Sequence, residues 1–451
     1  MDFVKTLERF YKMEADLKLF ERKDSNNIHY WDIFRFAIFD ELTEGGQNQI
    51  ATSHGKVTLS KLCKMILNVF YFAKCLTSRK CYFFYLASRN KYGYSSVLFD
   101  QNAQGILAKL DKNSVFINES YAGNKETLYD EYPRVKEIGC FSRFFPGPAK
   151  VPTEEFSTLV KEIISIFPSS TINVSRLANM YIRFYKERQL YSFIFKRTKP
   201  KKIFVTQNGI QKGLFAAAKD CNVPVFEFQH GIVNDGHLAY TYPSSLKIEE
   251  YVYRPSFFMT LSDFWLKDCY MPYTKTIVLG NDYFKPTINS DNPPIENRIL
   301  IVSSSFMRNA LFDFLEECKN SIKDFERYDI IYKLHPNEFQ SEESYKFHFQ
   351  SYKNVTVSTV EKNIAQWMES CSTMVTILST AAYEALQCKR KVIVLKRLNY
   401  QMMKPLFDFK NVYLVDNANE ISIALNKTIE NEDLTFFSSF NNEIANDIIN
   451  S

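Results

Sequence analysis

The sequence predicts an α/β protein built from two doubly wound domains. The chain has 451 residues and a mass of 52.8 kDa, and a single hydrophobic core stops growing at roughly 250–300 residues. Short apolar runs alternate with longer helical stretches along the chain, which is typical of α/β folds. Residues 285–297 (KPTINSDNPPIEN) are rich in Pro, Asn, Ser and Asp. We therefore expect this segment to link a domain of residues 1–284 to one of residues 298–433.

The strands are expected where the apolar runs occur. In the first domain these runs are residues 81–87, 114–118, 202–206, 223–229, 257–261 and 276–279. In the second domain they are residues 298–303, 330–334, 355–358, 374–378, 391–395 and 412–415. Such continuous apolar strands indicate parallel sheets covered on both faces. We expect the two sheets to face a central cleft, with ligands bound beyond the carboxyl ends of the strands.

Both ends of the chain are expected to be helical. Residues 1–80 predict a helical extension of the first domain, and residues 434–451 predict a C-terminal helix that packs back on it. The stretch 59–75 is apolar and basic, with Lys61, Lys64 and Lys74 among side chains that include Phe70 and Phe72. It is too short to span a bilayer. It can either pack in the core with its lysines in solvent or lie in a membrane interface.

Composition excludes several classes of function. Lys plus Arg number 56 and Asp plus Glu 51, and this net charge of +5 is too small to indicate a nucleic-acid partner. The 13 glycines form neither G-x-G-x-x-G nor a P-loop, which excludes those two phosphate-binding motifs. The nine cysteines are scattered without a C-x-x-C pair, so we expect free thiols and no metal site. Because residues 1–19 lack a secretory signal, we expect a cytoplasmic protein, at most peripheral on the inner membrane.

A first group of polar residues follows the predicted strand 223–229. His230 and Gly231 come directly after it, and Asp235 and His237 follow within the same loop. A histidine can exchange a proton near neutral pH, and a glycine allows a ligand to approach the backbone. We expect His230 to be the catalytic base and Gly231 and His237 to contact an acceptor. Asp235 and Glu119, the latter just beyond another predicted strand, are the alternative bases.

Further polar residues follow three strands of the second domain. Lys333, His335 and Pro336 form a K-x-H-P motif at the end of one strand. A cation and a histidine at this position suit a nucleotide phosphate or the groups beside it. Ser379 and Thr380 end another strand and precede a helix, where hydroxyls and free N–H groups can bind phosphate or simply cap the helix. Ser304 follows the first strand of this domain and is a weaker candidate.

These motifs carry a resemblance. K-x-H-P followed by S-T-A-x-x-E-A resembles the donor domain of GT-B glycosyltransferases of bacterial capsule and lipopolysaccharide synthesis, including polysialyl- and sialyltransferase-type enzymes. The H-G pair at 230–231 is similar to that of the teichoic-acid glycerophosphotransferases. The resemblance covers residues 201–395 at the level of motifs.

The resemblance implies roles for individual residues. His335 and Pro336 would contact the phosphate of the donor nucleotide, and Ser379 and Thr380 would hold phosphate oxygens. Glu384 would contact the ribose or simply complement the helix dipole. His230 would be the general base or an acceptor contact.

The implied function is transfer of a sugar from a nucleotide-activated donor to a growing surface glycan, either lipopolysaccharide O-antigen or capsule. The first domain would bind the glycan or lipid-linked glycan acceptor, and the second the donor, whose nucleotide (CMP, UDP or CDP) stays open. No two aspartates stand at D-x-D spacing, and no Glu stands eight residues before Glu384. We therefore expect an inverting, metal-independent enzyme without a cofactor. Alternatives are a glycerol- or ribitol-phosphate transferase, a GT-B sugar-nucleotide epimerase, and a non-catalytic glycan- or nucleic-acid-binding protein.

Overall fold

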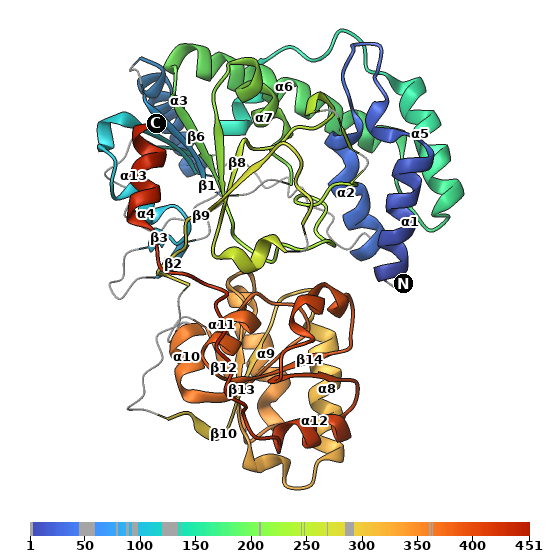
Figure 1. The fold of residues 1–451 in the computed structure, drawn as a ribbon, viewed down its shortest axis with the longest axis vertical. Helices are drawn as coiled ribbons and strands as arrows, with labels where there is room; N and C mark the ends of the chain where they lie inside the picture. Colours follow the sequence, from blue (N-terminus) through green and yellow to red (C-terminus); the bar gives the residue numbers. More distant parts are fainter. Residues whose placement is uncertain are drawn as a thin grey trace. The chain divides into compact units, whose positions relative to one another are not determined.

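The computed structural model shows two compact units, each with its own sheet (Figure 1). The residues that it describes are 3–44, 59–77, 80–86, 90–92, 98–119, 134–136, 138–206, 209–244, 246–247, 249–267, 269–284, 293–359, 362 and 364–451. Unit 1 comprises Met1–Leu261, Leu266–Leu279 and Phe440–Ser451, and unit 2 comprises Ser262–Trp265 and Gly280–Ser439. The predicted α/β class with two doubly wound sheets is confirmed.

Unit 1 contains a seven-stranded parallel sheet. Its strands are β1 (Tyr82–Leu86), β4 (Val115–Glu119), β5 (Arg134–Lys136), β6 (Lys202–Val205), β7 (Val225–Phe228), β8 (Phe257–Thr260) and β9 (Lys275–Val278). They lie in the order β5-β4-β1-β6-β7-β8-β9. The sheet extends in one direction from β1 through β4 to β5 and in the other from β6 to β9. The strand order therefore reverses between β1 and β6, which is where doubly wound sheets bind ligands.

The helices of unit 1 pack on this sheet or on one another. They are α1 (Phe3–Asp16), α2 (Trp31–Glu44), α3 (Leu59–Thr77), α4 (Gln104–Leu107), α5 (Thr153–Ile166), α6 (Val174–Thr198), α7 (Lys212–Asp220) and α13 (Asn442–Asn450), together with the 3₁₀ helix η4 (Ile138–Phe144). A short antiparallel pair, β2 (Asn90–Tyr92) and β3 (Leu98–Asp100), stands apart from the main sheet. Asn173 caps the start of the long helix α6, because its side chain accepts a hydrogen bond from the backbone N–H of Arg176.

The C-terminal helix belongs to unit 1, far from its neighbours in sequence. Ala445 and Ile448 of α13 lie in the hydrophobic core formed by β1, β4 and β6. The hydroxyl of Tyr82 donates a hydrogen bond to the carbonyl of Ile449, 3.1 Å away. Because α13 has an apolar side built from these residues, it covers one face of the sheet.

Unit 2 contains a six-stranded parallel sheet. Its strands are β10 (Ile295–Val302), β11 (Asp329–Lys333), β12 (Val355–Ser358), β13 (Cys371–Thr376), β14 (Lys391–Leu395) and β15 (Val412–Val415). Its helices are α8 (Arg308–Ser321), α9 (Glu342–His348), α10 (Ile364–Ser370), α11 (Ala381–Gln387) and α12 (Ala418–Leu425). The order β12-β11-β10-β13-β14-β15 is the 3-2-1-4-5-6 order of a Rossmann sheet. Its reversal lies between β10 and β13.

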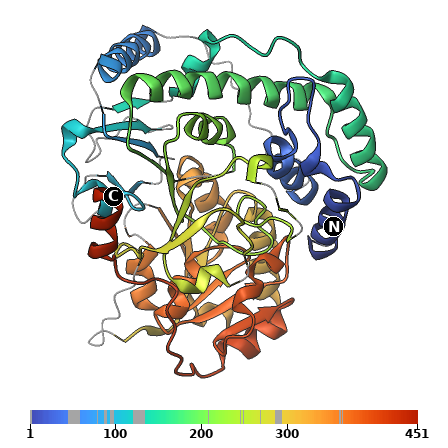
Figure 2. The ribbon, with the colours of Figure 1, turned by 45° about the horizontal axis from the view of Figure 1, so that its top comes forward.

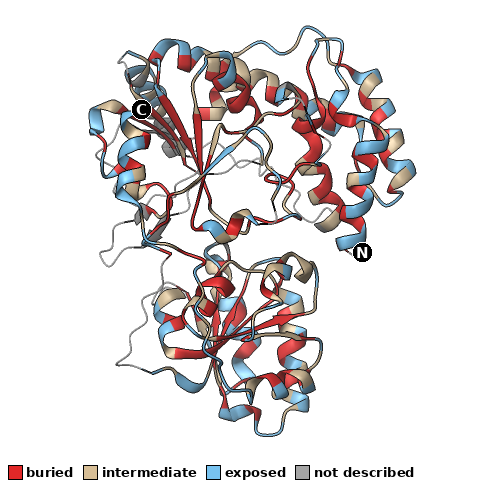
Figure 3. Cartoon of the chain, viewed as in Figure 1, coloured by how far each residue is buried: buried red, intermediate tan, exposed pale blue. Residues whose placement is uncertain are grey.

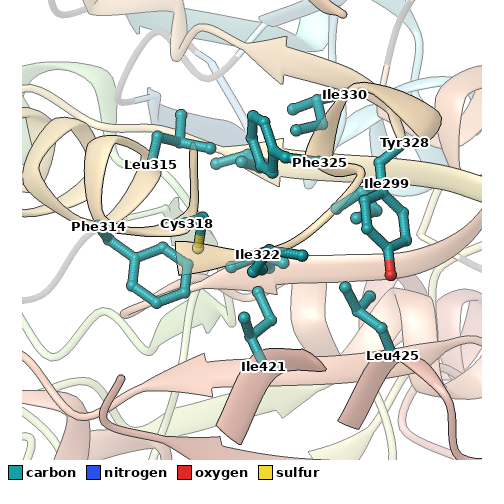
Figure 4. A pocket seen from close by; sticks show the side chains of 12 residues that line it. Ile299, Phe314, Leu315, Cys318, Ile322, Phe325, Tyr328, Ile330, Ile421 and Leu425 are labelled. Carbon is teal, nitrogen blue, oxygen red and sulfur yellow. The ribbon is translucent and has the colours of Figure 1, made fainter. Parts of the chain in front are cut away.

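A small cavity lies in the core of unit 2. It has a volume of about 20 Å³ and is lined by apolar side chains of α8, α12 and the strands, together with the sulfur of Cys318 (Figure 4). Burial raises the pKa of the Cys318 thiol to about 12, so this sulfur stays protonated. Because its lining offers no charged group, we regard the space as a packing defect and not as a ligand site.

The unit boundaries differ from those predicted. The strand β10 begins at Ile295, inside the segment expected to be a linker, and unit 2 extends to Ser439 instead of residue 433. Residues 262–265 also join unit 2, because the indole N–H of Trp265 and the hydroxyl of Ser262 both donate to the carbonyl of Phe436. The middle of the predicted linker, residues 285–292, lies outside the described residues.

The second segment of unit 2 begins at Gly280, where the backbone packs closely against residues 438–439 near the end of the chain. Gly280 has a φ of +69°, and a Cβ atom there would lie 2.1 Å from the carbonyl oxygen of Ser439. Only glycine allows this conformation and this approach. The backbone of Asn281 then donates a hydrogen bond to the carbonyl of Ser438, at 2.8 Å.

The strands β5 and β13 differ from the predicted runs for local reasons. The edge strand β5 was not predicted, because its three residues are Arg, Val and Lys and lack an apolar run. The strand β13 begins at Cys371 instead of residue 374, because Ser372 and Thr373 interrupt the apolar sequence although both are buried. No helix in the described ranges combines the length and the apolarity needed to cross a bilayer.

Candidate functional site

In unit 2, the sheet brings three of the predicted segments to neighbouring strand ends. The strand β10 lies between β11 and β13. Lys333 ends β11, Ser303 and Ser304 follow β10, and Ser379 follows β13. Because all strands are parallel, these residues share the carboxyl edge of the sheet at its point of reversal. The sheet thus brings residues that are up to 76 positions apart in sequence to neighbouring strand ends.

A buried carboxylate holds the His335 turn. The strand ends at Lys333, and Pro336 begins a 3₁₀ helix, so His335 stands on a turn and is exposed. His335 therefore lies beyond the strand that carries Lys333. The backbone N–H of His335 donates to Glu338 Oε2 at 3.2 Å, and the Glu338 carboxylate also accepts from the hydroxyl of Tyr345. Glu338 is only 1% exposed.

Lys333 brings a cation to the same edge. Its side chain is buried, and its ammonium lies 5.6 Å from the centre of the Phe339 ring. A cation over a ring face is stabilised by the ring quadrupole. The neighbouring Ser303 accepts a hydrogen bond from the hydroxyl of Tyr332 at 3.3 Å.

Two hydroxyls at this edge are buried without a partner. Within the described part of the chain, neither Ser304 Oγ nor Thr376 Oγ1 has a hydrogen-bond partner. Ser304 follows β10, and Thr376 is the last residue of the adjacent strand β13. A buried hydroxyl without a partner costs free energy, and such groups are uncommon in folded proteins. Their position at the reversal of the sheet makes a polar ligand a natural partner.

The side chain of Ser379 caps the first turn of α11. Ser379 Oγ accepts a hydrogen bond from the backbone N–H of Ala381, at 3.2 Å. Thr380 stands at the N-cap position but makes no capping hydrogen bond through its side chain. Glu384 is buried within the helix. The cap thus comes from Ser379, whereas the side chain of Thr380 makes no such bond.

In unit 1, His230 belongs to a chain of polar contacts. The hydroxyl of Tyr240 lies 3.4 Å from His230 Nδ1 and donates a hydrogen bond to Glu227 Oε1 at 2.8 Å. Glu227 lies in β7 and is 0% exposed. Since the phenol proton is directed to the carboxylate, the phenol oxygen can accept a hydrogen bond from Nδ1–H. This arrangement leaves Nε2 of His230 as the proton acceptor.

The turn that carries His230 is fixed by Gln229. Its side-chain amide donates to the carbonyl of Gly231 and accepts from the backbone N–H of Leu261, both at 3.0 Å. Gln229 therefore ties the end of β7 to the end of β8. A Cβ atom at Gly231 would meet nothing within 4 Å, so this backbone has open space beside it.

The other loop candidates lie against the N-terminal helices. His237 stacks on Phe36 of α2, with 5.7 Å between ring centres. Asp235 is exposed, and its backbone carbonyl accepts a hydrogen bond from the hydroxyl of Tyr11 of α1, at 3.0 Å. The helices α1 and α2 thus shape the loop after β7.

The backbone of Glu119 ends β4, which is separated from β7 by β1 and β6. Three steps between neighbouring strands correspond to about 14 Å. The side chain of Glu119 is not described. Sheet order therefore keeps the backbone of Glu119 apart from that of His230.

A pocket of about 70 Å³ lies near the reversal point of unit 1. It is lined by Gly209 and Ile210 after β6, by Lys212 and Gly213 of α7, and by residues of α2 and α6, among them the Arg183–Glu187 ion pair. Burial raises the pKa of Glu187, and Arg183 opposes this rise. Lys212 pairs with Asp32 at 3.0 Å. This pocket escaped sequence reasoning, because its walls come from three helices distant in sequence.

Glu227 and Glu338 were also missed. Glu227 is a charged residue in the middle of the apolar run VPVFEFQ, and Glu338 follows the K-x-H-P motif by two residues. A carboxylate inside an otherwise apolar strand is the signal that could have identified Glu227. Among the described residues, no group of three or more His, Cys, Asp or Glu side chains is arranged to hold a metal ion.

No protein-family model matches the chain, and no curated protein matches it in sequence. Solved structures with a similar backbone include UDP-GlcNAc 2-epimerase from Methanocaldococcus jannaschii in complex with UDP-GlcNAc and UDP, at 12% identity and a TM-score of 0.47, covering 82% of this chain and 98% of that one. Another is MurG from Acinetobacter baumannii, at 10% identity and a TM-score of 0.42, covering 77% and 89%. A third is HepE from Anabaena in complex with UDP and glucose, at 14% identity and a TM-score of 0.43, covering 76% and 88%.

Proposed function

We propose that the protein is a glycosyltransferase that moves a sugar from a nucleotide-activated donor to a growing bacterial surface glycan, lipopolysaccharide O-antigen or capsule, with inversion and without a metal ion. Unit 2 would bind the nucleotide sugar, and unit 1 would bind the acceptor, a glycan or lipid-linked glycan. We also propose that it works in the cytoplasm at the inner membrane. The K-x-H-P and S-T-A-x-x-E-A motifs support the donor assignment by their resemblance to GT-B transferases.

The observation that carries this proposal is the group of polar side chains at the reversal point of unit 2. The ammonium of Lys333 and the unpartnered hydroxyls of Ser304 and Thr376 belong to three adjacent strand ends. Phosphate oxygens accept hydrogen bonds and carry negative charge, so they would satisfy both hydroxyls and pair with the ammonium. His335 on the next turn would add a further donor.

The reaction would require one base and one stabiliser of the leaving group. As the acceptor hydroxyl attacks the sugar, its proton would pass to His230 Nε2, which Tyr240 and Glu227 keep in the required tautomer. The bond between the sugar and the nucleotide breaks, and the negative charge that develops on the phosphate would be met by Lys333 and the hydroxyls.

The donor assignment is tested by replacing His335 with Ala. Because hydrogen bonds to charged groups contribute about 1.5–3 kcal/mol, we expect nucleotide affinity measured by calorimetry to fall at least about tenfold. The exposed position of His335 leaves folding intact. His348→Ala, in α9 of the same unit, is the matched control and should bind nucleotide as the wild type does. Equal affinities of the His335→Ala variant and the wild type would remove His335 from the site.

The same preparation separates a transferase from an epimerase. A transferase releases free nucleotide only when an acceptor receives the sugar, whereas an epimerase converts one nucleotide sugar into another without an acceptor. Chromatography of the nucleotide products with and without acceptor distinguishes the two. Conversion of the donor sugar in the absence of any acceptor would contradict the transferase assignment.

A further inference from the structure

Three elements of unit 1 form a surface that is both apolar and basic. The helix α3 lies at the edge of this unit beside the end of α6 (Figure 2). Phe72 of α3 stacks on Phe141 of η4, with 4.6 Å between ring centres, and Arg197 of α6 donates to the carbonyl of Leu76 at 3.2 Å. These contacts define which side of α3 packs against the protein and which side remains outside.

The outer side of α3 is apolar. Ile66 is 59% exposed and Phe70 is 63% exposed, and with Ala73 they repeat at the four- and three-residue spacing of one helix face. At about 100° per residue, this face points away from Phe72. Phe70 and Phe72, which are close in sequence, therefore lie on different sides of α3. Phe72 packs against the protein, whereas Phe70 is exposed. Exposed residues along α3 appear in Figure 3.

Neighbouring elements enlarge this apolar face. Phe144 of η4 is 76% exposed and lies 6.5 Å from Phe141 between ring centres. Phe193 of α6 is also exposed and lies 5.9 Å from Phe145. We define the α3 surface as Ile66, Val69, Phe70, Phe144 and Phe193 with the basic residues Lys74, Arg143, Lys196 and Arg197.

The charge of the α3 surface is of one sign. Neither α3 nor η4 contains an Asp or Glu, and none occurs in α6 after Glu187. The basic residues at 74, 143, 196 and 197 are all exposed. A helix with an apolar outer face and basic flanks can lie in the interface of a bilayer, with aromatic side chains in the acyl boundary and cations among anionic headgroups.

We propose that the α3 surface docks unit 1 onto an anionic lipid bilayer. Charge complementarity selects this occupant, because α3, η4 and the end of α6 present exposed cations and exposed aromatic rings and contribute no acidic residue after Glu187. The proposal does not rest on catalysis, since it concerns the whole protein without substrate. It would bring a transferase to acceptors that are attached to the membrane.

Flotation with lipid vesicles tests the docking. The full-length protein should float with vesicles of phosphatidylglycerol and phosphatidylcholine at low salt, and it should stay in solution with phosphatidylcholine alone. Because each basic residue near an anionic surface contributes about fivefold in affinity, added salt should release the protein. Recovery with neutral vesicles equal to that with anionic ones, or no recovery with either, would overturn the proposal.

Paired variants assign the binding to these residues. Phe70→Ser combined with Phe144→Ser should weaken vesicle binding at least about tenfold, because each ring loses its transfer into the apolar region. Phe347→Ser, which removes a ring that is 72% exposed in unit 2, is the matched control and should bind as the wild type does. Vesicle binding unchanged in the double variant would contradict the assignment.

A second copy of the chain is the other possible occupant. Sedimentation at increasing protein concentration measures it directly. If the wild type forms a dimer that the double variant cannot form, and neither floats with anionic vesicles, the α3 surface is an interface between copies and the membrane proposal fails.

Discussion

Replacing His230 with Asn is expected to lower the rate of sugar transfer about 10²–10⁴-fold, the usual contribution of a general base. Asparagine retains a polar side chain of similar size but cannot accept a proton. The contact of His230 Nδ1 with the Tyr240 hydroxyl, which in turn donates to the buried Glu227, fixes the ring. Affinity for the nucleotide should stay near that of the wild type, because unit 2 would bind it.

A second substitution distinguishes the role of the base from that of the Tyr240 hydroxyl that positions it. Tyr240→Phe removes the hydroxyl that contacts His230 Nδ1 but leaves the imidazole in place. We expect a smaller decrease in rate than for His230→Asn, together with a shift of the pH–rate profile, because the tautomer and basicity of the ring change. Near-wild-type activity of His230→Asn would move the role of base to Asp235 or Glu119.

Replacing Arg35 with Met is expected to destabilise unit 1 by about 3–5 kcal/mol, the cost of leaving one partner of a buried ion pair alone. Arg35 Nε lies 2.6 Å from Glu14 Oε1, and both side chains are almost completely buried. The guanidinium also donates to the carbonyls of Leu238 and Thr241 in the loop after β7. The variant should therefore lose activity as well as stability. Urea unfolding followed by circular dichroism measures the change.

The pH dependence of this deficit has a definite sign. Burial raises the pKa of the Glu14 carboxyl above its ordinary value, and the Arg35 guanidinium opposes that rise. In Arg35→Met the native state would take up a proton on Glu14 that the unfolded state lacks at the same pH. The stability of the variant should then fall as pH rises above about 4.5 and recover toward lower pH. The double variant Glu14→Gln/Arg35→Met, which buries no charge, should regain part of the loss. A deficit that is the same at every pH would contradict this explanation.

The strands that could be predicted best from the sequence are those marked by a continuous run of apolar residues. The runs at 202–206 and 391–395 became β6 and β14 because a buried parallel strand needs continuous apolar side chains. The same reasoning identified the polar residues after β7, β11 and β13, since strand ends follow from the runs. Short edge strands such as β5 lack this signal.

What escaped prediction depends on contacts between residues far apart in the chain. Arg35 reaches Leu238 across 203 positions, and Trp265 reaches Phe436 across 171. A single sequence carries no pattern for such pairs, because each partner has ordinary neighbours. The N-terminal helices were therefore predicted as helices, but their role in shaping the loop of His230 was not.

The central claim is that unit 2 binds a nucleotide without a metal ion, and thermal unfolding in the presence of a chelator tests it most directly. CMP, CDP, UDP and GDP would each be added in EDTA, with inorganic phosphate as the control for a simple anion effect. We expect one of the nucleotides to raise the melting temperature, since a ligand at 100 times its Kd stabilises a protein by about 2.7 kcal/mol. We also expect this rise to be lost in His335→Ala. Absence of any shift, or a shift that appears only when Mg²⁺ or Mn²⁺ is restored, would contradict the account.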